Sequence, residues 1–426
     1  MASQDLSLKI VDGLSSYKSF FQKLLLLSIT FPHITFGLVP AETAPFPLVI
    51  ALILIILEKK INSFFVYSNF ILLLFWSITI PQGINILDGV EQLFVYLQNI
   101  YVAFYIYKCG LPSISQSFCL SLIGFHLMTG IAYTIGIDFF NNILVFLSSE
   151  RLGAEISRGQ GSRFFSTEPS EAMGSLFLVL ILYSLNRFKF FNFVVFFTLL
   201  VTAILSSSGT SFLLISIFLF SFFLIKYRLT GLLLLIFSIF CISFVLNNFL
   251  FDIAIDNRVL NLVRVAMSLG FLDLMNFINI SSGFRFTLDM ASFFSIFNLM
   301  PFYGIGSASS NSLFALTSYG VDLQNFSEFN YVDITNLKPT SLVATILIEF
   351  GILGLGFLLF FLVKMRRYLI FMFSNQFTNS ERSILIVVIF KLFFLMIVGT
   401  PASIATVFLA FYYINLKKIE TSRTIE

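Results

Sequence analysis

Long apolar runs separated by short polar or Gly/Pro-containing breaks dominate this sequence from near residue 20 to near residue 416. A bilayer core about 30 Å thick is crossed by roughly 20 apolar residues in a helix, and backbone amides in lipid must bond within their own segment. The runs therefore predict helices, since strands of a membrane barrel would alternate polar and apolar positions. Twelve spans are expected, near residues 20–38, 44–57, 63–80, 90–107, 113–135, 170–185, 190–206, 210–225, 229–247, 341–363, 383–399 and 401–416.

The positions of lysine and arginine test this count. Cytoplasmic loops are enriched in both residues, and every even-numbered span is followed by a basic residue or cluster. This alternation predicts that both termini are cytoplasmic. The basic residues after spans two, four, six, eight, ten and twelve are Lys59 and Lys60; Lys108; Arg187 and Lys189; Lys226 and Arg228; Lys364, Arg366 and Arg367; and Lys417 and Lys418.

Two segments on the opposite, outward side are long. They run from about residue 136 to 169 and from about residue 248 to 340. Loops of this length in compact proteins are usually functional or disordered. Both retain apolar periodicity, which predicts amphipathic helices at the membrane interface over residues 138–149 and 284–298. The expected architecture is an all-α integral membrane protein, a single polytopic domain over residues 1–426 with two large periplasmic loops.

Composition supports this class and excludes others. Of the 426 residues, 58% are hydrophobic and 11% charged, whereas a soluble domain carries roughly 25% charged residues. The net charge of +3 gives no reason to expect a nucleic-acid partner, and no glycine-rich phosphate-binding loop is present. Cys109, Cys119 and Cys241 have neither metal-ligand spacing nor the pattern of a disulfide framework.

The basic residues of the two outward loops are almost all arginine. Arginine binds phosphate oxygens bidentately and stays charged when partly desolvated. Single arginines have simpler explanations, such as an i,i+4 pair between Arg285 and Asp289 or binding to lipid headgroups. As a set they favour an anionic ligand at the outer membrane surface. They are Arg151, Arg158, Arg163, Arg258, Arg264 and Arg285, against one lysine, Lys338.

The densest chemistry lies between Arg158 and Glu171, where the sequence reads RGQGSRFFSTEPSE. Its glycines let the backbone approach a ligand closely. Two arginines and two carboxylates follow at the start of the sixth span. Glu171 is also explained as a first-turn carboxylate favoured by the helix dipole, but that explanation covers neither Arg163 nor the glycines.

Four pieces of the sequence resemble, in their order and spacing, the Wzy-type O-antigen polymerases, members of a superfamily that includes the O-antigen ligases. The resemblance covers most of the chain from about residue 140. It implies a glycosyltransferase of the bacterial inner membrane, which transfers a growing glycan from undecaprenyl pyrophosphate to a new lipid-linked repeat unit at the periplasmic face. A chain-length regulator protein is a further expected partner. The pieces are RFFSTEPSEA (163–172), SSSGTSFLL (206–214), RFTLDMASFF with PFYGIGS (285–307) and EFGILGLGFLL (349–359).

Such a transfer needs a base for the acceptor hydroxyl and positive charge for the departing pyrophosphate. Glu168 is the expected base, with Glu171 as the alternative, and Arg163 and Arg285 are the expected clamp. No D-x-D motif occurs in either loop, so the reaction is expected to need no metal or other cofactor. Further pyrophosphate-binding candidates are Arg158, Arg258, Arg264 and Lys391.

Histidines and buried charge separate the alternatives. The ligases are associated with a histidine in the second large loop, whereas His33 and His126 both lie in predicted spans, which favours a polymerase. Lys391 lies in the eleventh span, where charge is costly and usually faces the bundle interior. It could pair with Glu349 or Glu42 or contact the pyrophosphate. A lipid-linked oligosaccharide flippase is the transporter alternative, but ionisable residues concentrate in the loops and no internal repeat is visible.

Overall fold

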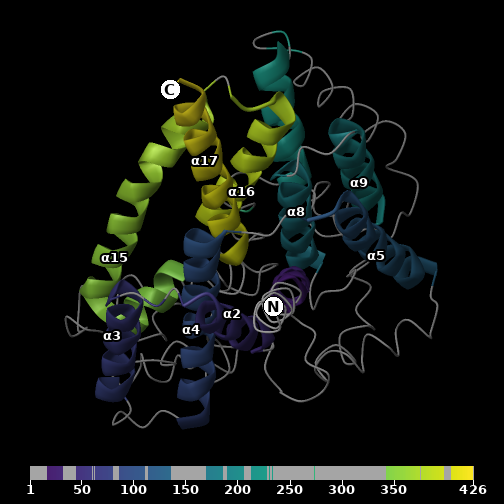
Figure 1. Cartoon of the computed structure of the whole chain (residues 1–426). Coiled ribbons are helices and arrows are strands. Elements are labelled where there is room, and N and C mark those ends of the chain that lie inside the picture. The colour runs from purple at the N-terminus through teal and green to yellow at the C-terminus, as the bar shows by residue number, and fades with distance from the viewer. Residues whose placement is uncertain are drawn as a thin grey trace, which may run out of the picture.

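The computed structural model describes residues 17–31, 45–59, 61, 63–79, 86–110, 114–135, 169–185, 190–205, 213–227, 342–374, 376–397 and 404–425, with single residues at 230, 233 and 273. Within these ranges every regular element is a helix, so the prediction of an all-α protein is confirmed for them. Residues 17–30 and 213–227 are also helical. The labelled helices in Figure 1 are α2 (Phe46–Leu57), α3 (Ser63–Thr79), α4 (Ile86–Cys109), α5 (Gln116–Ile135), α8 (Pro169–Leu185), α9 (Phe191–Leu205), α15 (Leu342–Met372), α16 (Asn379–Ile397) and α17 (Ile404–Ile425).

Where predicted spans fall on described residues, the chain is helical except at a few residues near the ends of the helices. The sixth predicted span, 170–185, coincides with α8, and the third, 63–80, coincides with α3. The ninth span, 229–247, lies almost entirely outside the described residues. The expected interfacial helices at 138–149 and 284–298 lie wholly outside them.

Length and hydropathy together single out few of these helices as membrane spans. In the described part of the chain, α5 is long and apolar enough to cross a bilayer. The two parts of α15, Leu342–Gly356 and Leu358–Met372, are bent by 55° and would make a second span if they act as one. Five more apolar helices are shorter, from 10 to 17 residues. The count of twelve spans therefore stays a prediction.

The tenth predicted span, 341–363, is not the single straight helix that its hydropathy suggests. Within the first of the two parts, Leu342–Gly356, the backbone breaks at Gly351, where φ is 59° and ψ is −147°. A Cβ on Gly354 would lie 2.6 Å from Cγ2 and 2.8 Å from the carbonyl oxygen of Ile346. Eight residues of continuous helix would separate these positions by about 12 Å, so the chain folds back at the break. Figure 1 shows the two arms of α15 as a V.

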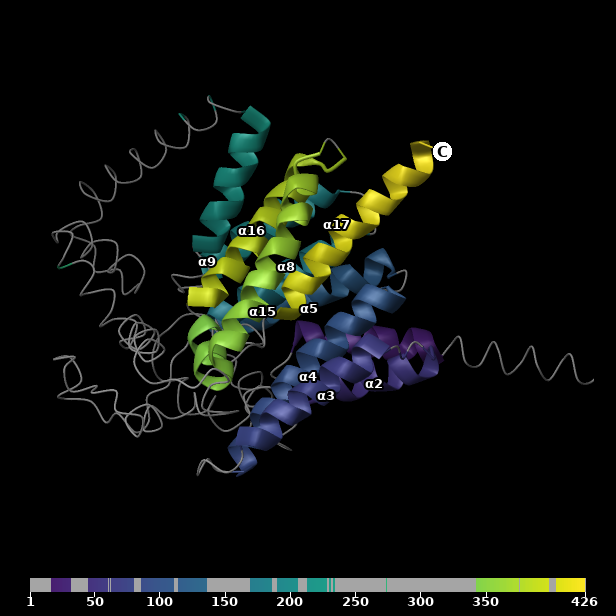
Figure 2. The same ribbon diagram turned by 90° about the vertical axis from the view of Figure 1, so that its left-hand side faces the viewer.

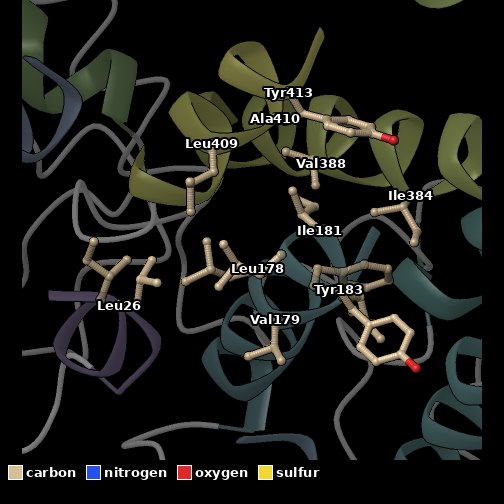
Figure 3. Close-up of a cluster of buried hydrophobic side chains, with 14 of the residues drawn as sticks. Leu26, Leu178, Val179, Ile181, Tyr183, Ile384, Val388, Leu409, Ala410 and Tyr413 are labelled. Carbon is tan, nitrogen blue, oxygen red and sulfur yellow. The ribbon is translucent and has the colours of Figure 1, made fainter. Parts of the chain in front are cut away.

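The core of the bundle surrounds α8. From Leu176 to Tyr183 every residue of this helix is at most 1% exposed. A helix that is apolar all round is stable only when it is covered on all sides. α8 packs against α5, α9, α16 and α17, and α16 and α17 lie beside it in Figure 1 and Figure 2. Figure 3 shows Ile181 of α8 next to Val388 of α16.

One polar cluster joins the beginning of the helix at 17–30 to the ends of α2 and α4. The Lys18 ammonium lies 3.0 Å from the Glu58 carboxylate. The Tyr105 hydroxyl donates to the same carboxylate at 3.1 Å, and the Gln22 amide donates to Tyr105 at 2.6 Å. The basic residues of the sequence assign all three helix ends to the cytoplasmic side, and that assignment stays a prediction.

Two further contacts join helix ends assigned to that side. The Gln116 amide at the start of α5 donates to the Tyr183 hydroxyl at the end of α8 over 3.0 Å. The Ser380 hydroxyl at the start of α16 donates to the amide oxygen of Asn192 at the start of α9. α16 thus begins near the chain that leaves α8, which makes α8 and α16 antiparallel neighbours.

The start of α16 also holds a buried charged cluster. Thr378 and Glu381 form a reciprocal capping box, in which the Thr378 amide donates to the Glu381 carboxylate at 2.7 Å and the Glu381 amide donates to the Thr378 hydroxyl at 3.3 Å. The Tyr413 hydroxyl donates to the same carboxylate, and the Lys417 ammonium lies 3.7 Å from it. The cluster fastens α17 to the first turn of α16.

Candidate functional site at the start of α8

Two of the predicted site residues belong to the described part of the chain. Glu171 is in the first turn of α8, where its backbone is described, and Lys391 is in α16 with its side chain. The remaining candidates lie outside the described residues, so their arrangement stays a prediction. They are Arg158, Arg163, Glu168, Arg258, Arg264 and Arg285.

The segment that carries Arg158 to Glu168 leads directly into the most buried helix of the bundle. α8 begins at Pro169, immediately after Glu168. Proline fits the first turn of a helix because the amide hydrogen that it lacks would have no partner there. The two sequence-predicted carboxylates therefore flank the first residue of α8, Glu168 just before it and Glu171 within its first turn.

Lys391 approaches α8 from α16. Its side chain is 7% exposed, as expected for an ionisable residue that faces a bundle interior. The ammonium nitrogen would be 1.8 Å from a Cβ placed on Gly174, so it lies directly against the backbone of α8. Gly174 follows Pro169 by five residues, or about 7.5 Å along the helix axis. The charge is thus near the end of α8 that the segment from Arg158 to Glu168 enters.

The sequence identified Lys391 but not Gly174. A lysine within an apolar run stands out in the sequence alone. A glycine within such a run is equally consistent with close helix–helix packing and with no particular role. Its one distinguishing feature in the sequence is that it lies three residues after Glu171, in the run EAMGSLFL. Which side chain would fill the space above Gly174 depends on the packing of α16.

A second buried polar site joins α4 to the break in α15. Glu349 is completely buried, and the Tyr96 hydroxyl donates to its carboxylate at 2.5 Å. The Tyr96 ring also packs edge-on against Phe350, with ring centroids 5.4 Å apart. The suggested pairing of Lys391 with Glu349 or Glu42 stays a prediction, and Glu42 lies outside the described residues.

Histidine and cysteine add no further site in the described ranges. His126 is buried in α5, in keeping with a core histidine, and His33 lies outside these ranges. Cys119 is a buried free thiol, Cys109 is the last residue of α4, and Cys241 is not described. No group of three His, Cys, Asp or Glu side chains is close enough to hold a metal in this part of the chain.

Comparison with known proteins finds no match: no family model, no curated protein and no solved structure is significantly similar to this chain.

Proposed function

We propose that this protein is a Wzy-type surface polysaccharide polymerase of the bacterial inner membrane. It transfers a growing glycan from undecaprenyl pyrophosphate to a new lipid-linked repeat unit at the periplasmic face. The observation that carries the proposal is that the segment from Arg158 to Glu168 leads directly into α8. The buried Lys391 lies against Gly174, five residues after the first residue of that helix. Carboxylate and cationic groups are thereby associated with one end of the central helix.

Apolar side chains on the outside of the bundle support a location in the bilayer. Soluble monomers rarely expose large contiguous apolar surfaces. Here Phe70 of α3 is 63% exposed, Phe193 of α9 is 69% exposed and Val363 of α15 is 68% exposed. Along α3 alone, the exposed apolar residues are Val66, Tyr67, Phe70, Ile71, Leu73 and Leu74. Lipid chains are the solvent that suits such faces.

The contacts between helix ends support the proposed orientation. Lys18 with Glu58, Gln116 with Tyr183, and Ser380 with Asn192 each join positions that the basic residues assign to the cytoplasm. If the even-numbered spans end in the cytoplasm, then the first turn of α8 and the adjacent Lys391 are on the outward half of the bundle. The lipid-linked substrates of a periplasmic polymerase would meet them there.

The proposed mechanism is a single displacement at the anomeric carbon of the donor sugar. The acceptor hydroxyl loses its proton to Glu168, or alternatively to Glu171, as its oxygen forms the new bond to that carbon. The bond from the anomeric carbon to the pyrophosphate oxygen breaks, and undecaprenyl pyrophosphate leaves with the electron pair. Arg163 and Arg285 stabilise the charge that develops on the leaving group. Arg158, Arg258, Arg264 and Lys391 add positive charge around it, and no metal takes part.

The proposal is tested with purified protein in lipid nanodiscs that is supplied with lipid-linked repeat units. Elongated glycans are the expected product, and Glu168→Gln and Arg163→Ala should each lower elongation by about 100-fold or more. The matched variant Glu171→Gln separates the two candidate bases. Normal chain length in both the Glu168 and the Arg163 variants would exclude these roles.

Two alternatives give different products in the same assay. An O-antigen ligase of the same superfamily would transfer the finished glycan to lipid A–core without elongating it. A flippase would move the lipid-linked unit across the bilayer unchanged. One observation supports the flippase as a second candidate function. α15 breaks at Gly351, with the buried Glu349 beside the break, and transporters often use discontinuous helices at their substrate sites.

A further inference from the structure

We propose that the junction between the end of α4 and the later part of α15 binds the phosphate group of an anionic phospholipid, with Lys108 and Arg367 as the cations that contact it. The inference goes beyond the proposed function: it requires that the bundle lies in a bilayer, but not that the protein elongates a glycan. The basic residues predict that this end of the bundle faces the cytoplasm. Basic sites between helices on that side suit anionic headgroups.

Two consecutive aromatic residues of α17 connect this part of α4 to this part of α15. α17 packs against both helices. The Phe411 ring and the Tyr368 ring of α15 have centroids 5.4 Å apart. The hydroxyl of Tyr412 lies 2.5 Å from the place where Gly110, the residue after α4, would carry a Cβ. The end of α4 and the turn of α15 that holds Tyr368 therefore both lie against one turn of α17.

Two tyrosines stand between the cations at this junction. Tyr107 of α4 is 58% exposed, and its hydroxyl is close enough to that of Tyr368 for the two to interact electrostatically. The Lys108 ammonium lies 5.8 Å from the centre of the Tyr107 ring. Arg367 directly precedes Tyr368, and both cations are exposed. One cation from each helix thus flanks a pair of tyrosines, a residue type enriched at membrane interfaces.

The charges of these two cations are not balanced within the described part of the chain. Neither Lys108 nor Arg367 forms a salt bridge with a described carboxylate, whereas Lys417, assigned to the same side, is paired with Glu381. Along α4 and α15 themselves, the nearest carboxylates are seventeen or more residues away. An anion from outside the protein is therefore the counter-ion that would stabilise both cations.

Apolar side chains around Arg367 favour a lipid headgroup over a free ion. Val363 and Ile370, one turn before and about one turn after Arg367 in α15, are both exposed. A guanidinium between two exposed apolar turns suits the depth at which acyl chains give way to headgroups, because arginine is weakly hydrated and stays charged there. Its planar fork binds two phosphate oxygens at once. Acyl chains would cover the apolar residues while the phosphate neutralises the cations.

Helix register distinguishes Arg367 from its neighbour Arg366. Successive residues of an α-helix are rotated by about 100°. Arg367 is therefore displaced by about 100° from Tyr368, and Arg366 by about 200°. Arg366 projects away from the junction, so it supplies a matched charge on the same turn of α15.

The test measures lipid binding by the full-length protein in a nonionic detergent. The protein is titrated with phosphatidylglycerol or with phosphatidylcholine, and the rise in the thermal unfolding midpoint gives the apparent affinity. Phosphatidylglycerol should bind more tightly than phosphatidylcholine. Lys108→Gln and Arg367→Gln should each weaken phosphatidylglycerol binding about fivefold, as expected for one basic residue at a membrane surface. The double variant should weaken it about thirtyfold, because the two charges act on one phosphate without touching each other.

Matched controls remove charge elsewhere. Arg366→Gln should weaken binding by less than about twofold, because its charge is screened over the longer distance. Lys226 is also exposed, and its ammonium lies 4.9 Å from the centre of the Tyr227 ring. It belongs to the helix at 213–227, which packs on α9, so Lys226→Gln should keep the wild-type affinity. Inorganic phosphate, which has no acyl chains, should not stabilise the protein at the same concentrations.

Three results would overturn the proposal. Equal stabilisation by the two lipids, or equal stabilisation by inorganic phosphate and phosphatidylglycerol, would reject an anionic phospholipid as the ligand. Wild-type affinity in the double variant would reject the junction as the site. A fivefold loss in Lys226→Gln would show that binding follows the overall positive charge of that side. None of these measurements depends on glycan elongation, so the lipid site and the polymerase can fail separately.

Discussion

Two adjacent lysines near the C-terminus occupy opposite environments. Lys417 is buried, 3.7 Å from the Glu381 carboxylate, and lies over the rings of Phe377 and Tyr413 at 5.6 and 5.7 Å from their centroids. Lys418 is exposed. Sequence alone assigns both to the cytoplasmic end of the last span, because the positive-inside pattern does not distinguish a charge that orients the chain from one that fastens two helices.

Lys417→Met should destabilise the protein by about 3 kcal/mol, because it leaves the buried Glu381 carboxylate without its cation. Lys418→Met removes the same charge from an exposed position and should change the stability by less than about 0.5 kcal/mol. Thermal unfolding in detergent compares the two variants. Equal midpoints would show that the contact between Lys417 and Glu381 contributes nothing to stability.

The buried hydrogen bond between Tyr96 and Glu349 leads to a second prediction. Tyr96→Phe removes the donor but keeps the ring that packs on Phe350. Since a buried carboxylate loses one of its hydrogen-bond donors, the free energy of unfolding should fall by about 1–3 kcal/mol. Tyr67→Phe in α3, where the ring is 65% exposed, should have no measurable effect. A Tyr96→Phe variant as stable as the Tyr67→Phe control would mean that the bond makes no net contribution.

These residues show which part of the candidate site the sequence could supply. Lys391 stood out because a charge within an apolar run is conspicuous. Tyr96 and Gly174 did not stand out, since an aromatic residue and a glycine are ordinary in apolar helices. Their roles arise from partners 253 and 217 positions away along the chain, which follow from helix packing rather than from local pattern.

At the scale of the elements, helix positions followed from hydropathy and basic residues, while the shape of α15 did not. The run EFGILGLGFLL is uniformly apolar, and an apolar window gives the same signal for a straight helix and for two arms folded together. Three glycines in this run permit a break without requiring one. Only the positive φ of Gly351 and the contact of Gly354 with Ile346 define the fold-back.

Two nearby glycines of α15 test this geometry. A methyl group on Gly354 would meet the Ile346 carbonyl oxygen at 2.8 Å, and backbone cannot move aside as a flexible side chain can. Gly354→Ala should therefore cost about 1–3 kcal/mol of stability through overpacking. Gly356→Ala meets nothing within 4 Å and should be neutral or slightly stabilising, because alanine favours a helix. Thermal unfolding of both variants is the measurement, and equal stability would argue against a folded-back α15.

At the scale of the whole molecule, the sides predicted for the helix ends can be compared with the contacts that join these ends. The basic residues assign sides by a rule about membrane insertion, whereas the contacts of Lys18 with Glu58 and of Ser380 with Asn192 come from the structure. Each contact joins two ends that the basic residues assign to the same side, and the topology itself stays a prediction. Neither observation involves the large outward loops. The arrangement of the predicted arginines around α8 therefore stays a hypothesis.

The orientation of the bundle determines whether that hypothesis is possible, and it is directly measurable. In a variant whose three cysteines are replaced by alanine, a single cysteine is introduced at Lys418, which is exposed on α17 and assigned to the cytoplasm, or at Lys338 in the second outward loop. A membrane-impermeant maleimide added to intact spheroplasts should label Lys338→Cys, since an accessible thiolate is the reactive form. Lys418→Cys should be labelled only after the membrane is permeabilised. Labelling of Lys418→Cys from outside would reverse the bundle and place the start of α8 on the cytoplasmic side, where a periplasmic polymerase could not use it.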